Sequence, residues 1–384
     1  MLKSFAFTLV IGFFITAAFC QSQQIKSSAD LNVLSSLITE DQLKAKLYFI
    51  TSDLFQGRAV GSAGELLCAE YIASQYMSWG IPPAGNRKSN NLSDYLQSFP
   101  FQAGQRSGKS QNVIAFIEGS DPQLKNDVIV LSSHYDHVGI GAKVEGDSIY
   151  NGAADDGSGT VVMLEIAHAI MEAKMRGLQL KRSILFLHTG GEESGLLGSA
   201  YYTMQEPIVS LEKTFATINM DGVGGTDKPD AANANSYVYL LHNDSTSSKL
   251  RYLAVRVNER MSEKLDLLVP ANPQQFNSDS KSFEYQLVPT LYFSTGLTEH
   301  YHKPSDEAHT INYAHMASIA RLVFSFTCEV ANTTASMNFD RTGYQKTGKY
   351  FCKPCGCSLD NKEFDEPGKC TACNMVLQPY WKKL

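Results

Sequence analysis

Apolar runs alternate with amphipathic stretches through the middle of the chain. Six runs rich in β-branched and aromatic residues predict strands, and the stretches between several of them carry apolar residues at helical spacing. The expected strands are 112–118, 127–133, 183–188, 214–220, 236–241 and 289–293, and the expected helices are 158–176, 194–204, 246–263 and 311–327. This alternation favours a three-layer α/β/α sandwich around a mixed, mostly parallel sheet.

The region before these strands predicts helices and then a loop. Residues 41–80 form two helical patterns, and the second begins at Ser62, with Glu65 three residues on as a capping box, and stops at Gly80. Residues 84–110 are rich in Gly, Ser, Asn and Arg, a composition that indicates a loop.

The first twenty residues have the order of a secretory signal peptide. Lys3 precedes an apolar run over 5–19, and small residues close it before a polar stretch. The run is short for a membrane span, so we expect none in the mature chain, and an uncleaved anchor is the alternative. The expected location is therefore secreted or periplasmic. A lipid on Cys20 is less expected, because the bulky Phe19 precedes it.

The charge and the cysteine content of the chain limit the partners and the domain organisation that we expect. The 384 residues carry a formal net charge of -6 and no Lys/Arg-rich run, so we expect no nucleic-acid partner. Five of the eight cysteines lie between 352 and 373, so the body does not depend on a disulfide framework. We expect a catalytic domain over 21–335 and a small cysteine-rich module over 345–384.

Histidines and carboxylates gather where the expected strands end. They are His134 with Asp136, Asp155 with Asp156, Glu192 with Glu193, Asp221, and His302. Each taken alone has an ordinary explanation, such as a solvated helix start. Because strand ends converge in this architecture, we expect the five sets to meet. Their nitrogen and oxygen donors suit Zn²⁺ better than Ca²⁺ or Mg²⁺.

The order of these motifs resembles the co-catalytic di-zinc aminopeptidase family, which also includes glutamate carboxypeptidases and glutaminyl cyclases. The resemblance runs from about residue 40 to about 330 and includes 52–62, which is similar to the family's leading motif. It implies His134 and Asp221 as ligands of one zinc ion, Glu193 and His302 as ligands of a second, and Asp155 as a bridge between the two.

The same resemblance implies roles for the neighbouring residues. Glu192 would be the general base, and Tyr301 is similar in placement to a phenol that polarises the scissile carbonyl. A cis peptide is implied after Asp155. In extended backbone, Asp136 lies on the same side as His134, so its carboxylate could accept the second ring proton of His134.

The tail has a metal-binding pattern of its own. Two C-x-x-C pairs separated by fourteen residues resemble a zinc ribbon, with Cys352, Cys355, Cys370 and Cys373 as ligands of one further zinc ion. The tail also resembles a short bacterial heavy-metal-binding module, which has a histidine where Cys355 stands. Cys357 is then extra, and the fourth ligand is open. The alternative is a pair of disulfides with one spare thiol.

The expected function is a secreted zinc-dependent exopeptidase, in the first place an aminopeptidase that acts on peptides. A carboxypeptidase or a glutaminyl cyclase on the same scaffold is the first alternative, and an inactive metal-binding or peptide-binding protein is the second. The complete donor set together with Glu192 speaks against the inactive form. Two zinc ions in the core would favour hydrolysis, and one would favour cyclisation.

Overall fold

The computed structural model describes residues 28–384 apart from 87, 243, 337–342, 353–356, 361 and 374. The expected signal peptide, 1–20, lies outside the described residues. Among the residues that are described, no helix is both long enough and apolar enough to cross a membrane.

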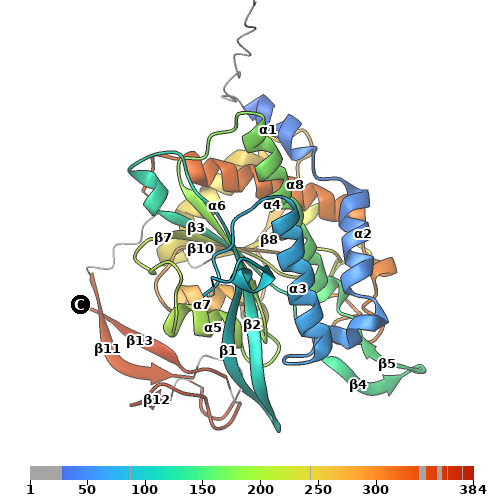
Figure 1. Cartoon of the computed structure of the whole chain (residues 1–384), viewed down its shortest axis with the longest axis vertical. Coiled ribbons are helices and arrows are strands. Elements are labelled where there is room, and N and C mark those ends of the chain that lie inside the picture. The colour runs from blue at the N-terminus through green and yellow to red at the C-terminus, as the bar shows by residue number, and fades with distance from the viewer. Residues whose placement is uncertain are drawn as a thin grey trace, which may run out of the picture.

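Eight strands form the central sheet, in the order β1-β2-β6-β3-β7-β10-β8-β9 (Figure 1). In chain order they are β1 (Leu96–Ala103), β2 (Arg106–Ile117), β3 (Val128–His134), β6 (Ser183–Thr189), β7 (Thr214–Met220), β8 (Tyr237–His242), β9 (Asp266–Leu268) and β10 (Thr290–Ser294). β3 pairs in parallel with both β6 and β7, and β7 pairs in parallel with β10. The β1–β2, β2–β6 and β10–β8 pairs are antiparallel, so the sheet is mixed with a parallel centre.

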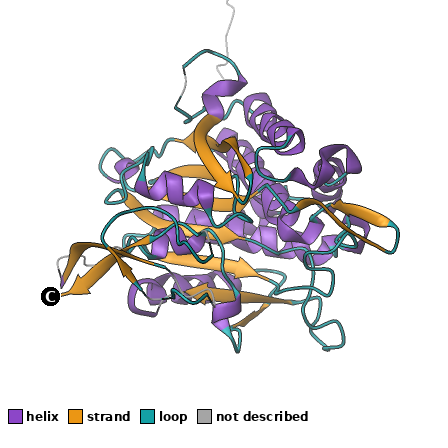
Figure 2. Ribbon diagram, turned by 90° about the horizontal axis from the view of Figure 1, so that it is seen from below, coloured by secondary structure: helices purple, strands orange, loops and turns teal. Residues whose placement is uncertain are grey.

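Helices cover both faces of this sheet, as the strand pattern predicted (Figure 2). Ile129 and Leu131 of β3 belong to a large buried cluster with helix residues, whereas Val128 and Val130 belong to a second cluster on the opposite face. The larger cluster takes in α1 (Ser28–Ser35), α2 (Glu40–Ile50), α3 (Ala63–Ser78), α4 (Ser158–Met175), α6 (Asp244–Asn258) and α8 (Tyr313–Asn332). The smaller one includes residues of α5 (Leu197–Met204) and α7 (Ser280–Glu284).

The start of α3 is as predicted, but only half of the capping box forms. The side chain of Ser62 accepts a hydrogen bond from the backbone N–H of Glu65. The carboxylate of Glu65 does not return this bond to Ser62. It accepts from the backbone N–H of Gly61 and from the hydroxyl of Ser110, which turns it into the protein interior.

The prediction of a loop over 84–110 is wrong from Leu96 onward. β1 and β2 form a long antiparallel hairpin, with Leu96 opposite Val113 and Ala103 opposite Arg106. The hairpin lies at the edge of the sheet and the first residues of β2 are exposed, which explains its polar composition. Phe99 and Phe101 of β1 are buried in a small cluster of their own. Alternating aromatic residues among polar ones were the strand signal in this segment.

Two smaller sheets lie outside the central one. β4 (Gly139–Val144) and β5 (Asp147–Tyr150) form a hairpin between the His134 and Asp155 segments. In the tail, β11 (Tyr344–Phe351), β12 (Glu363–Phe364) and β13 (Gln378–Lys383) form a three-stranded sheet in the order β12-β11-β13. This tail sheet lies beside β1 at the margin of the molecule (Figure 1).

Candidate active site

Four parallel strands bring the site residues together. β3 ends at His134, and Asp221 directly follows the end of β7. Glu192 and Glu193 follow β6 after a short turn, and His302 follows β10. Since these strands run in parallel, their carboxyl ends meet at one edge of the sheet. These side chains lie close together in the structure, as the sequence predicted.

The first group of donor atoms consists of His134, Glu192 and Asp221. One nitrogen or carboxylate oxygen from each lies within 4.8 Å of the others. Nε2 of His134 is 3.7 Å from Oδ1 of Asp221. These three residues come from the ends of three neighbouring strands, β6, β3 and β7.

The second group consists of Asp155, Glu193, His302 and one histidine that the sequence analysis did not assign, His137. Their donor atoms also lie within 4.8 Å of one another. Nε2 of His302 is 3.1 Å from Oε2 of Glu193, and Nδ1 of His137 is 2.9 Å from Oε1 of Glu193. His137 is fully buried beside the His302 ring. β3 ends at His134, so strand alternation did not predict where His137 would point.

Asp155 connects the two groups through its two carboxylate oxygens. Oδ1 lies 3.2 Å from Nε2 of His134, and Oδ2 lies 3.1 Å from Nε2 of His302. The peptide between Asp155 and Asp156 is cis. One carboxylate therefore faces both donor groups, which is the position that a ligand shared by two cations requires.

The charges in the site are strongly coupled. Burial opposes ionisation of Asp155, but hydrogen bonds to His134 and His302 hold its pKa well below the usual range of an aspartate. Burial also disfavours the charged form of His302, yet Asp155 and Glu193 raise its pKa to about 10. Burial raises the pKa of Glu192 well above the usual range of a glutamate. Glu192 thus has a higher proton affinity than Asp155.

Asp136 supports the site in a different way from the one predicted. Nδ1 of His134 lies 3.2 Å from the backbone carbonyl oxygen of Asp136 and 3.7 Å from its carboxylate. The carboxylate instead accepts hydrogen bonds from the backbone N–H groups of Glu192 and Glu193, at 3.0 and 3.4 Å. Asp136 is fully buried, so it fixes both the His134 ring and the turn that carries the two glutamates.

Two further buried residues hold the loops that carry the donors. The carboxylate of Asp306 accepts hydrogen bonds from the backbone N–H groups of Ala154 and Asp155. The guanidinium of Arg58 donates to the carbonyl oxygens of Tyr135 and Asn151, among others. Arg58 lies within the stretch 52–62 that resembles the family's leading motif, but neither Arg58 nor Asp306 was assigned a role from the sequence. Local pattern does not tell which distant carbonyl or N–H a polar side chain will meet.

One pocket is lined by donor residues of both groups, namely His134, Asp155, Glu192, Glu193 and Asp221. Phe276, Tyr292, Leu297 and Tyr301 supply apolar and aromatic surface to its wall. The Tyr301 ring stacks on the His302 ring, with centroids 3.8 Å apart, and 39% of Tyr301 is exposed. A second pocket adjoins the first and shares the wall residues Ala154, Leu297 and Thr298 with it.

The segment that forms this site matches a known family. Residues 112–327 match the model of Peptidase family M28, and this span contains every donor residue described above. The chain belongs to peptidase family M28.

Two curated relatives illustrate the similarity of this M28 chain at the sequence level. It is 37% identical over 167 residues to leupeptin-inactivating enzyme 1 of Streptomyces exfoliatus, which covers 44% of the chain and 31% of the relative. It is 30% identical over 148 residues to aminopeptidase YwaD of Bacillus subtilis, which covers 38% and 29%. The chain thus spans less than a third of the length of these relatives.

Solved structures show the same fold as this M28 chain. The LapA aminopeptidase of Legionella pneumophila has a TM-score of 0.60 at 22% identity, covering 81% of this chain and 77% of that one. A zinc aminopeptidase of Bacillus subtilis has a TM-score of 0.58 at 16% identity, covering 79% and 98%. The glutaminyl cyclase of Porphyromonas gingivalis has a TM-score of 0.56 at 18% identity, covering 76% and 99%. At these identities the likeness is one of fold.

Three of the four predicted tail cysteines converge in the structure. Cys352, Cys370 and Cys373 lie together, and Cys357 is the fourth member of their group. The C-x-x-C spacing predicted Cys355 as the fourth ligand, with Cys357 as the extra thiol. Cys355 lies outside the described residues.

Proposed function

We propose that this protein is a zinc-dependent exopeptidase of the aminopeptidase type. The observation that carries the proposal is the pair of donor groups joined by Asp155, with the Glu192 carboxyl next to them. Paired cations with a carboxylate base are suited to the attack of water on an amide. A complete donor set with a base speaks against a site that only binds peptides.

The residues of the two groups fit zinc. Imidazole nitrogens and carboxylate oxygens are common zinc donors, and the described core site contains no thiol. Among the described residues, Nε2 of the fully buried His137 ring has no hydrogen-bond partner, and Nδ1 faces the carboxylates of Glu193 and Asp155. A buried imidazole that faces two carboxylates suits a metal ion held between these groups. We propose His134 and Asp221 for one ion, Glu193 and His302 for the other, Asp155 as the bridge, and His137 as an additional donor.

Zinc, when bound, would supply a Lewis acid beside the scissile carbonyl and lower the pKa of a water molecule. The chain then contributes proton transfer and orientation. Glu192 takes a proton from the attacking water and returns it to the leaving amine, so that the base is restored at the end of the cycle. The Tyr301 hydroxyl, at the mouth of the same pocket, donates a hydrogen bond to the carbonyl oxygen as negative charge develops there.

The charge of the pocket favours a free amino terminus over a free carboxyl terminus. Asp155, Glu192, Glu193, Asp221 and Asp306 line the first pocket, and no Lys or Arg is among the described residues that line either pocket. Bound zinc would offset the charge of the three proposed ligands, Asp155, Glu193 and Asp221, so the preference rests on the lack of a cationic side chain in this wall to pair with a substrate carboxylate. The aromatic wall residues would take the first side chain, and the adjoining pocket would give room for the rest of the peptide.

The test combines zinc analysis with substrate panels on the purified protein. Aminoacyl-arylamides, their N-acetylated forms, carboxypeptidase substrates and an N-terminal glutamine peptide are compared, with and without a chelator. We expect two zinc ions in a variant whose tail cysteines are replaced by serine, and hydrolysis that requires a free amino group. Hydrolysis from the carboxyl end, or cyclisation with one zinc ion, would refute the aminopeptidase assignment. A core without zinc would refute the whole proposal.

We also propose that the protein works outside the cytoplasm, in the periplasm or after secretion. The proposal rests on the order of charged, apolar and small residues over 1–20. Its test is the amino-terminal sequence of the protein recovered from the periplasm or medium of expressing cells. Recovery of the uncleaved chain in the cytoplasm alone would contradict it.

A further inference from the structure

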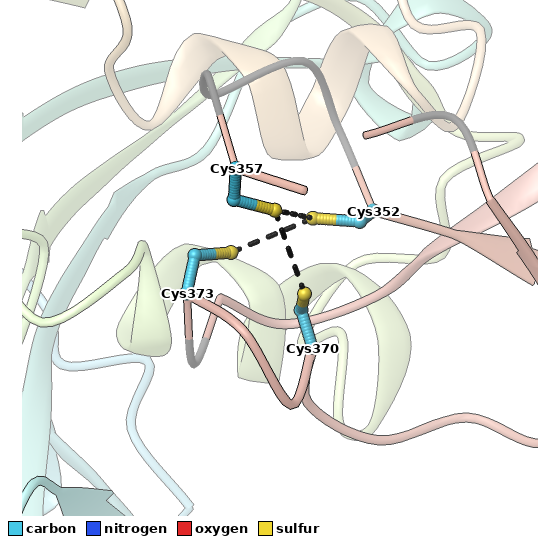
Figure 3. Close-up of side chains that lie close together, drawn as sticks. All are labelled: Cys352, Cys357, Cys370 and Cys373. Atoms are coloured by element: carbon cyan, nitrogen blue, oxygen red, sulfur yellow. Dashed lines mark hydrogen bonds between the residues drawn. The ribbon is translucent and has the colours of Figure 1, made fainter. Parts of the chain in front are cut away.

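The tail holds a cluster of thiols that the peptidase site does not use. Cys352 directly follows β11, and Cys357 lies in the turn after it. Cys370 and Cys373 come from the loop before β13. Figure 3 shows the four side chains directed toward one another from these two loops. Two loops separated in sequence thus present all four sulfur atoms to one small volume.

The spacing of the sulfur atoms fits a single metal ion at their centre. The Sγ atom of Cys352 lies 3.7 Å from that of Cys357 and 3.5 Å from that of Cys373, and the Sγ atoms of Cys357 and Cys370 are 3.8 Å apart. Zinc–sulfur bonds of about 2.3 Å at tetrahedral angles place the sulfur atoms roughly 3.8 Å apart. We propose that Cys352, Cys357, Cys370 and Cys373 form a tetrathiolate site for one zinc ion.

The surroundings of the sulfur atoms suit thiolates. The backbone N–H of Leu359 donates to the sulfur of Cys357 at 3.4 Å. The backbone N–H groups of Ala372 and Cys373 donate to the sulfur of Cys370. Such donors stabilise negative charge on sulfur and orient the ligand. Four thiolates also fill a tetrahedral shell, so this ion has a structural role and no open position for a substrate.

Two disulfides do not account for the arrangement as well. A disulfide pairs each sulfur with one partner, whereas Cys352 lies close to both Cys357 and Cys373, and Cys357 lies close to both Cys352 and Cys370. None of the four cysteines is in a disulfide in the structure. Four sulfur atoms with such shared contacts are arranged as ligands around a single metal ion would be.

The ion explains how so small a module keeps its shape. Its buried cluster consists of Cys352, Cys370 and Leu377, with Tyr350 and Phe364 partly buried against it. A core of this size does not stabilise a domain without a disulfide or a metal. The module in turn packs on the peptidase domain, since Val376 contacts the cluster around Phe99 and Lys369 donates to the carbonyl oxygen of Gln102. The tail ion would therefore stabilise a surface that contacts β1.

Cobalt substitution of the full-length protein separates this site from the catalytic one. Thiolate-to-cobalt charge-transfer absorption reports the tail alone, because the core donor groups contain no cysteine. We expect this absorption in the full chain. In Cys357→Ser we expect the affinity of the tail for cobalt to be at least tenfold weaker. Cys355→Ser is the matched control and should bind as the unaltered chain does. Loss of the signal in Cys355→Ser with retention in Cys357→Ser would overturn the assignment.

A second measurement does not depend on folded variants. In the unaltered zinc-loaded protein, alkylation followed by peptide mapping should modify Cys355 first and protect Cys357, Cys370 and Cys373 until a chelator is added. Disulfides among these residues in the protein as isolated, with no zinc in the tail, would overturn the proposal. Equal and rapid alkylation of Cys355 and Cys357 in the presence of zinc would overturn it too.

Discussion

The Nε atom of Arg58 donates a hydrogen bond of 2.7 Å to the carbonyl oxygen of Tyr135, the residue after the donor His134. The same guanidinium donates to the carbonyl oxygens of Ile50, Asn151 and Gly152. Arg58 is fully buried, and it joins the loop after β3 to the loop that leads to Asp155. One side chain thus sets the separation of the two segments that carry His134 and Asp155.

Replacing Arg58 with Lys should destabilise the protein although the positive charge is kept. An ammonium group at one point cannot reach four carbonyl oxygens that a planar guanidinium spans. We expect the free energy of unfolding to fall by about 3 kcal/mol or more, because buried acceptors lose their partners. Urea unfolding measures this loss. Arg176→Lys is the control, since that side chain is 54% exposed, and equal stability of the two variants would contradict the role of Arg58.

Replacing Asp155 with Asn should affect both core metal ions, whereas replacing Asp221 with Asn should affect one. The two oxygens of Asp155 face different donor groups, and Asp221 belongs to the group of His134 only. We expect the dialysed Asp221→Asn protein to keep one core zinc ion and Asp155→Asn to keep less than that. Zinc is counted by elemental analysis in a background without tail cysteines. An Asp155→Asn protein with one fully occupied core site would show that the carboxylate is not shared.

Glu192→Gln should retain zinc and lose hydrolysis. Glutamine has nearly the same shape but cannot accept the proton of the attacking water, so we expect turnover to fall about 10³-fold. Zinc content must be measured in the same sample, because Glu192 also lies within 4.8 Å of the donor atoms of His134 and Asp221. Glu70→Gln is the control, since Glu70 is exposed on α3 and lines neither pocket. Loss of an ion from Glu192→Gln would make Glu192 a ligand.

The sequence allowed the fold class and most of the core donors to be predicted, because both depend on local pattern. Buried strands appear as short apolar runs, and the donors stand directly at their ends, as with His134 and Asp221. The order of these motifs was specific enough to indicate the family. The β1–β2 hairpin was missed because an exposed edge hairpin has the composition of a loop.

What could not be predicted depends on distant contacts. The position of His137 depends on how the chain turns after β3 ends, and no periodicity covers that turn. The carboxylate of Asp136 meets N–H groups of Glu192 and Glu193, 56 and 57 residues away. In the tail, C-x-x-C spacing favoured Cys355, which lies outside the described residues, and it gave no role to Cys357, which the structure places in the group.

Glu65 should make stability depend on pH. Burial, and then the charge of Asp136, raises the pKa of Glu65 from 4.5 to about 8. Between these pH values the folded protein keeps a proton that the unfolded chain releases. The contribution of Glu65 to the free energy of unfolding is therefore fully present below pH 4.5 and is lost as the pH rises through 8. Over this range the free energy of unfolding falls by up to about 1.4 kcal/mol per pH unit.

Urea unfolding of Glu65→Gln across pH 4.5 to 8 tests this dependence. The amide carries no charge at any of these pH values, so we expect the free energy of unfolding to decline less steeply with pH than in the unaltered chain. Glu70→Gln on the same helix, α3, is the control, because Glu70 is exposed. Parallel pH profiles for Glu65→Gln and the unaltered chain would contradict the raised pKa.

Tyr301→Phe should lower kcat while KM and zinc content change little. Burial, and then the carboxylates of the site, raise the pKa of the Tyr301 phenol, so its hydroxyl stays protonated and can donate to a developing oxyanion. We expect kcat to fall about 10²-fold, the usual effect of removing one such donor. Tyr301→Leu separates this role from packing, since it also removes the ring that stacks on His302. If Tyr301→Phe keeps full turnover and only Tyr301→Leu loses it, the ring positions His302 and the hydroxyl takes no part in the reaction.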